Sequence, residues 1–131
     1  MRWIRKLIIL LLLAGCGEPV VDLNGMEVIY FGEPNEQMKL IAETVKECMQ
    51  SDIQGLPSVR IVSGRFECRA DIGWVHTDGC YDYENKTATL SLPDLLRTNG
   101  QVWAHELTHF YGGRNEHNDC GNVWFGGFTF P

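Results

Sequence analysis

The first regular pattern of apolar residues in the chain predicts an amphipathic helix. Apolar side chains recur every three or four positions over residues 34–50, at Met38, Ile41, Ala42, Val45, Cys48 and Met49. Charged residues occupy the opposite side, so this helix is expected to pack against a sheet. Pro34 suits the first turn of such a helix.

Short β-prone runs predict the strands of that sheet, at residues 28–31, 59–62, 72–76, 81–83 and 87–92. The last run is the clearest, because Ala88, Leu90 and Leu92 point to one face while threonine and serine point to the other. We interpret Asn85-Lys86-Thr87, which also matches the N-glycosylation pattern, as the hairpin turn before this strand.

A second helix is predicted after Pro93, because Thr98 and Gln101 have the spacing of a capping box. It should end at the glycine pair Gly112-Gly113. The element order predicts an α+β fold in which two helices lie on one twisted mixed sheet of about five strands. No repeat or linker divides residues 27–131, so we expect one domain there.

The first fifteen residues have the features of a secretory signal. Three basic residues precede an uninterrupted aliphatic run over 7–13, which is too short for a bilayer span of about 20 residues. Leu13-Ala14-Gly15-Cys16 resembles the signal of bacterial lipoproteins. The resemblance implies a signal peptide (1–15), lipidation of Cys16, a tether (16–26) and export to the cell envelope, with Cys16 as the membrane anchor. The alternative is an ordinary signal peptide followed by a chance cysteine.

Charge and cysteine content agree with export. Without the signal, 11 basic residues become 8 against 17 acidic ones, so the net charge changes from −6 to −9. Such a charge argues against nucleic acid as a partner. The four remaining cysteines favour two disulfides in an oxidising compartment, and we favour Cys68 with Cys80 among the three possible pairings. Cys120 is expected in a disulfide too.

The second helix contains the candidate chemistry, His105-Glu106-Leu107-Thr108-His109. Histidines four residues apart share one helical face and can bind one zinc ion. Glu106 lies beside them and can act as general base toward a water that zinc activates, and then as general acid toward the leaving amine. The alternative is a surface helix with two histidines by chance.

A catalytic zinc usually has three protein ligands. Among the donors after His109, we favour His117 as the third ligand, then Asp119, then Glu116. His76 is the main upstream donor, and we interpret it instead as a polar residue at a strand end. Tyr81, Tyr83 and Tyr111 could each bind an oxyanion, but each is expected to be a packing residue. The aromatic C-terminal segment, residues 124–130, is expected to fold over the core or to form the floor of the active-site cleft.

The segment from His105 to His117 resembles the zinc-binding segment of the metzincin metallopeptidases, in particular the matrixin-like pattern H-E-x-G-H-x-x-G-x-x-H. The third histidine of that pattern falls on Asn115 here, and His117 comes two residues later. No methionine follows Met49, so the Met-turn of that family is absent. The resemblance implies a minimal zincin-like domain with a backing helix and an active-site helix. It also implies an edge strand, from the strand pair at 72–92, that binds substrate.

The sequence therefore predicts an exported, membrane-anchored zinc metallopeptidase that hydrolyses peptide bonds in a protein or peptide substrate. Glu106 is the predicted catalytic residue, and His105, His109 and His117 are the predicted Zn²⁺ ligands. Two alternatives stay open: a non-enzymatic surface lipoprotein with a structural zinc site, and a zinc amidase that acts on cell-wall peptide.

Overall fold

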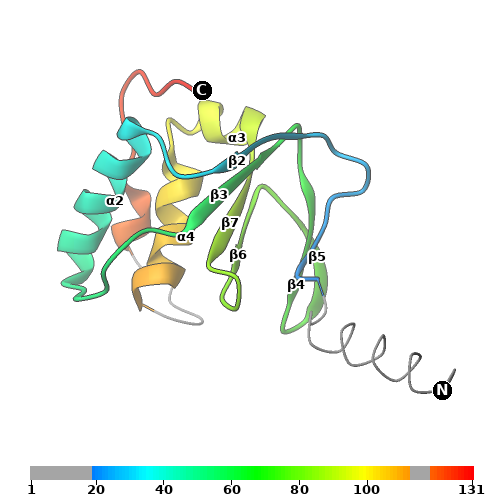
Figure 1. Ribbon diagram of the computed structural model, residues 1–131, viewed down its shortest axis with the longest axis horizontal. Coiled ribbons are helices and arrows are strands. Elements are labelled where there is room, and N and C mark those ends of the chain that lie inside the picture. The colour runs from blue at the N-terminus through cyan, green and yellow to red at the C-terminus, as the bar shows by residue number, and fades with distance from the viewer. Residues whose placement is uncertain (1–18, 113–118) are drawn as a thin grey trace, which may run out of the picture.

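A central sheet separates two large helices from a smaller sheet (Figure 1). The computed structural model describes residues 19–112 and 119–131. The strands are β1 Val21–Asp22, β2 Val28–Gly32, β3 Ser58–Val62, β4 Phe66–Ala70, β5 Gly73–Thr77, β6 Gly79–Asp82 and β7 Thr87–Ser91. The helices are α2 Glu36–Met49, α3 Leu92–Arg97, α4 Gln101–Gly112 and the 3-10 helix η1 Asp119–Asn122. The α+β class is confirmed.

Helix α2 begins at Glu36, so Pro34 precedes the N-cap and does not lie in the first turn. Asn35 is its N-cap, and the Asn35 side chain accepts a hydrogen bond of 2.8 Å from the backbone N–H of Met38. The predicted apolar face is buried at Met38, Ile41, Ala42 and Val45. The last helical residue is Met49, and the C-cap residue Gln50 has a left-handed conformation with a φ of 53°.

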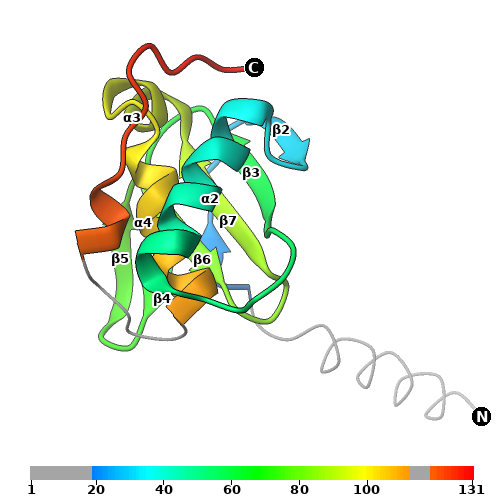
Figure 2. The ribbon, with the colours of Figure 1, turned by 90° about the vertical axis from the view of Figure 1, so that its left-hand side faces the viewer.

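The central sheet has the strand order β2-β3-β7-β6. Strands β3 and β7 run parallel, whereas the other two pairs are antiparallel, so the predicted mixed sheet is confirmed. Helices α2 and α4 cover the same face of this sheet (Figure 2). Trp103 on α4 is fully buried in the core between them, and its indole N–H donates to the carbonyl of Met38 at 2.8 Å.

The expectation of one sheet was wrong. Strands β1, β4 and β5 form a second, antiparallel sheet that covers the other face of the central one. The sequence pattern placed the polar side chains of β7 on the face opposite Ala88 and Leu90, and this second face is buried too, since Thr89 is 1% exposed and Ser91 is fully buried. Phe66 of β4 and the disulfide partner Cys68 pack on that face. Strand β4 was not predicted because few of its side chains are buried.

The expectation of a single helix after Pro93 was also wrong, because the chain forms two helices, α3 and α4, in succession. Gly100 separates them with a φ of 85°, a conformation that favours glycine. A Cβ on Gly100 would also lie 2.6 Å from Ile41 Cδ1. The predicted capping box does not form, since the Gln101 side chain donates to Asn122 at 3.4 Å instead.

Two disulfides connect the layers. Cys68–Cys80 is the predicted pairing and joins the two sheets, and Cys48–Cys120 joins α2 to η1. The C-terminal segment packs on the core through Phe128, which is 5% exposed, so it folds over the core and does not line the cleft described below. Within residues 19–112 and 119–131, no helix has the length and apolarity needed to cross a membrane.

Candidate metal centre

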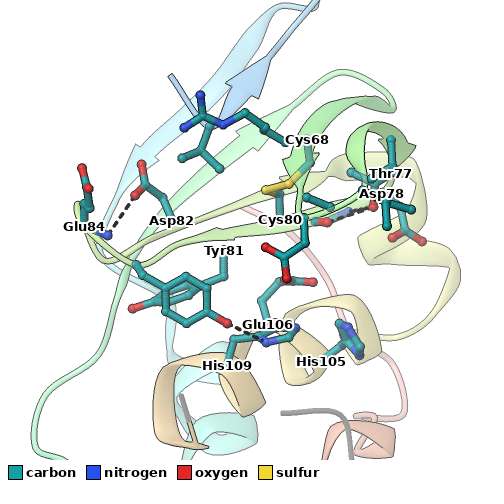
Figure 3. A pocket seen from close by; sticks show the side chains of 18 residues that line it. Cys68, Thr77, Asp78, Cys80, Tyr81, Asp82, Glu84, His105, Glu106 and His109 are labelled. Atoms are coloured by element: carbon teal, nitrogen blue, oxygen red, sulfur yellow. Dashed lines mark hydrogen bonds between the residues drawn. A yellow bond between two sulfur atoms is a disulfide. The ribbon is translucent and has the colours of Figure 1, made fainter. Parts of the chain in front are cut away.

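Helix α4 brings His105, Glu106 and His109 together. Each offers one ligand atom, and these atoms all lie within 4.8 Å of one another. The predicted i, i+4 spacing thus places both imidazoles on one side of the helix, and Figure 3 shows the three side chains pointing toward β6. His105 is exposed and His109 is half-buried, whereas Glu106 is only 4% exposed.

These side chains line a cleft of about 810 Å³. One wall is β6, which is an edge of the central sheet, and another is the turn between β4 and β5. A smaller cavity of about 280 Å³ shares Asp78, His105 and Glu106 with the cleft and extends toward η1. The metal-binding group therefore lies where the two cavities meet.

The Glu106 carboxylate lies against the start of β6. A Cβ on Gly79 would be 2.9 Å from Glu106 Oε2 and 2.8 Å from Val102 Cγ1, so only glycine allows this approach. Burial, and secondly the negative charge of Asp78, raise the pKa of Glu106 from 4.5 to about 8. A carboxyl group with such a pKa can exchange a proton near neutral pH, as a general base and acid must.

Tyr83 positions one of the imidazoles. Its hydroxyl lies within hydrogen-bonding distance of His109 Nδ1, at 2.9 Å. A metal-binding histidine almost always uses its second ring nitrogen for a hydrogen bond of this kind, which fixes the tautomer and the ring orientation. Tyr83 was expected to be a packing residue, and its contact with His109 could not be deduced from sequence spacing.

The residues considered as a third zinc ligand lie in different parts of the chain and are not all described by the structure. His117, the favoured one, and Glu116 lie outside the described residues. Asp119 begins η1, is exposed, and does not belong to the group of three. Cys120 is in the disulfide with Cys48, as expected. His76 lies on β5 beside Glu67, with 3.2 Å between His76 Nδ1 and Glu67 Oε1, and is confirmed as a polar strand residue outside the metal-binding group.

The chain returns to α4 directly after the segment that contains His117. A Cβ on Gly121 would lie 3.2 Å from the Cα of His105, so η1 packs closely against the helix beside this histidine. Cys48–Cys120 holds the same stretch to α2. The described chain therefore resumes at Asp119 and passes beside His105 at Gly121.

The donor set suits zinc. Two imidazoles on one helical turn are typical zinc ligands, and an adjacent carboxylate that is not needed as a ligand suits a catalytic site. Within residues 19–112 and 119–131, these three side chains form the group that could hold a metal ion. The lipidation candidate Cys16 lies outside the described residues.

The chain was compared with known proteins in three ways. No protein-family model matches it, and neither curated proteins nor solved structures give a match.

Proposed function

We propose that the protein is a zinc metallopeptidase with Glu106 as its catalytic residue and His105 and His109 as zinc ligands. The observation that carries the proposal is the convergence of these three side chains within 4.8 Å at the junction of two cavities. A purely structural zinc site has no need for a buried carboxylate beside its ligands or for an open cleft.

His117 is the third ligand in this proposal. The support is the course of the chain on either side of it, from Gly112 at the end of α4 to Gly121 packed on His105. The Cys48–Cys120 disulfide holds the start of η1, three residues after His117, to α2. A ligand held in this way would complete the three-histidine set that the resemblance to metzincins implies.

The chemistry divides between the metal and the protein. When bound, zinc would polarise a peptide carbonyl and lower the pKa of water toward about 7. Glu106, which lines both cavities beside the two histidines, takes the proton of the attacking water and passes it to the leaving nitrogen. Tyr83 holds the His109 ring in the orientation in which it binds metal.

Strand β6 would bind the substrate. It is the edge of the central sheet and lines the cleft from Gly79 to Asp82. An extended peptide can add to such an edge through main-chain hydrogen bonds, and so lie above the metal-binding group. This edge belongs to the strand pair that the resemblance to metzincins indicates, and a minimal zincin-like domain is the fold that we propose.

The two disulfides indicate an oxidising environment. We propose that the protein reaches it by export and is held at the cell envelope by a lipid on Cys16, so that its substrate is an envelope or extracellular polypeptide. Mass spectrometry of the mature N-terminus tests this point separately, because an acylated Cys16 supports anchoring and an unmodified one excludes it.

Zinc content and peptide cleavage test the proposed activity. Glu106→Ala should keep zinc and lose at least about 100-fold in cleavage rate, as removal of a general base does. His105→Ala and His109→Ala should lose zinc, whereas His76→Ala, which removes an exposed histidine outside the group, should not. Zinc binding without cleavage of any peptide would favour the structural-site alternative, and cleavage confined to cell-wall peptides would favour the amidase. If His117→Ala binds zinc as tightly as the wild type, His117 is not the third ligand.

A further inference from the structure

Negative charge surrounds the cleft on several sides. Besides Glu106, its lining includes the carboxylates of Asp71, Asp78, Asp82 and Glu84. Among the described residues that line the cleft, Arg69 is the one lysine or arginine. These acidic residues come from the β4–β5 turn, the start of β6 and the β6–β7 turn, so they surround the metal-binding group instead of lying on one exposed face.

Asp78 has the most informative position in this set. It lines both the cleft and the smaller cavity, and so do His105 and Glu106. The Asp78 side chain is half-buried and makes no hydrogen bond or ion pair with the rest of the described chain. The other walls of the smaller cavity include the neutral polar residues Thr98, Gln101 and Asn122.

Glu106 is a second, independent indication that the cavity takes a ligand. This carboxylate is 4% exposed, lines both cavities and has no hydrogen-bond partner among the described residues. Among the described residues no fully buried side-chain oxygen or nitrogen lacks a hydrogen-bond partner, so the Glu106 oxygens still face the open space of the cleft. A ligand at the junction of the two cavities can therefore contact this carboxylate.

Carboxylates lie at both ends of β6. Asp78 directly precedes the strand and Asp82 is its last residue, so about 13 Å of extended chain separates them. Asp82 is fixed by hydrogen bonds from the backbone N–H groups of Glu84 and Asn85, at 3.0 Å and 3.1 Å, and keeps its negative charge in place. A peptide lying along β6 would cross the metal-binding group with an acidic side chain near either end.

We propose that the cleft selects polypeptide segments with lysine or arginine beside the bond that is cut, and that Asp78 is the main residue that determines this specificity. The inference rests on the proposed peptidase activity. An ammonium or guanidinium group that enters the smaller cavity would give Asp78 a direct hydrogen-bonded partner, in addition to its longer-range charge interaction with Arg65, and the neutral polar walls would solvate that group. The net charge of −9 on the exported part would also favour basic over acidic segments at long range.

Matched peptides test the inference. Three quenched fluorescent peptides that differ only by Lys, Gln or Glu at the same position, next to the cleaved bond, would be compared on the zinc-loaded protein. We expect kcat/KM to be about tenfold higher for the Lys peptide than for the Gln peptide, with the Glu peptide lowest. Raising the salt from about 0.05 M to 0.5 M should reduce the difference.

Variants assign the preference to Asp78. Asp78→Asn should bring the Lys-to-Gln ratio close to one and leave zinc affinity unchanged. Asp52→Asn, an exposed carboxylate outside the cleft, should leave both unchanged. If Asp78→Asn fails to fold, the double variant Asp71→Asn, Glu84→Gln should still lower the ratio, because both side chains are exposed. A loss of zinc affinity in Asp78→Asn would instead make Asp78 a metal ligand.

The two proposals fail in different ways. If the wild type cleaves all three peptides equally, the charge preference is wrong and the peptidase proposal stands. If it cleaves none, the peptidase proposal is wrong. Binding of labelled peptides to Glu106→Ala, measured by fluorescence anisotropy, then still decides the charge preference: equal affinities for the Lys and Glu peptides would overturn it.

Discussion

The hydroxyl of Tyr83 lies 2.9 Å from Nδ1 of His109, and this contact links the β6–β7 turn to α4. The rings also meet edge to face, with centroids 6.1 Å apart. Tyr83 and His109 are 26 positions apart in the chain, and the Tyr83 hydroxyl fixes the orientation of the His109 imidazole. The contact makes the orientation of the His109 ring depend on the position of the sheet edge.

Removing this hydroxyl should weaken metal binding. We expect Tyr83→Phe to lower zinc affinity by about 10- to 100-fold, the usual effect of losing the second hydrogen bond of a metal-bound histidine. Competition with a chromophoric chelator measures the affinity. Tyr30→Phe is the matched control, because its hydroxyl donates to the Glu33 carbonyl at 2.6 Å, away from the cleft. Equal zinc affinity in Tyr83→Phe and the wild type would show that Tyr83 does not orient His109.

Gly79 should tolerate no side chain. The methyl group of Gly79→Ala would meet Glu106 Oε2 at 2.9 Å and Val102 Cγ1 at 2.8 Å, so β6 or α4 must shift. We expect a loss of about 1–3 kcal/mol in the free energy of unfolding, measured with urea, and a lower cleavage rate. Gly126→Ala adds the same methyl group with its nearest neighbour at 3.7 Å, and it should change neither quantity. A Gly79→Ala protein as stable as the wild type would contradict this packing.

Burial of Glu106 should make the metal-free protein less stable as the pH rises. Its pKa is raised from 4.5 in the unfolded chain to about 8 in the folded protein, so the folded state holds a proton that the unfolded chain releases. The stabilisation from this proton is complete below about pH 4.5 and is lost as the pH rises toward 8. Unfolding by urea in the presence of a chelator should show a decrease of about 2–4 kcal/mol across this range.

Glu106→Gln should abolish that part of the pH dependence and unfold at higher urea concentration than the wild type at pH 8. Glu47→Gln, an exposed residue of the same type on α2, should keep it. If the wild type and Glu106→Gln have parallel stability profiles from pH 4.5 to 8, the carboxyl group is not buried in the way described above.

The two disulfides should differ in their contribution to stability. Cys48–Cys120 closes a loop with a sequence separation of 72, and Cys68–Cys80 one of 12. The loss of loop entropy in the unfolded chain predicts about 4 kcal/mol for the longer loop and about 3 kcal/mol for the shorter one. Paired Cys→Ser variants measured in urea test this order.

Loss of Cys48–Cys120 should also weaken zinc binding, because this disulfide holds the chain that follows the proposed third ligand. The Cys68–Cys80 variant, which leaves this part of the chain intact, is the control for this effect. A longer-loop variant that binds zinc as tightly as the wild type would show that the disulfide does not position the ligand segment.

Local sequence patterns predicted those helices and strands whose apolar side chains follow a clear period. The apolar spacing of Met38, Ile41 and Val45 gave α2 because a helix with one buried face must repeat every 3.6 residues. The strands β3 and β7 were predicted because branched or alternating side chains suit a sheet. The placement of His105, Glu106 and His109 also followed from sequence, since the geometry of a single helical turn brings them together.

Contacts between distant segments could not be predicted in this way. Nothing local in β7 shows that Thr89 and Ser91 are buried, because their burial depends on a second sheet built from β1, β4 and β5. The same holds for Tyr83 at His109 and for Asp78 between two cavities, where partners from separate elements meet only after folding. Helix periodicity is a local property, so the spacing of His105, Glu106 and His109 was enough to indicate that these side chains could hold a metal ion. The tertiary structure alone decided what surrounds them, because burial, charge and the position of the sheet edge arise from packing between elements far apart in the chain.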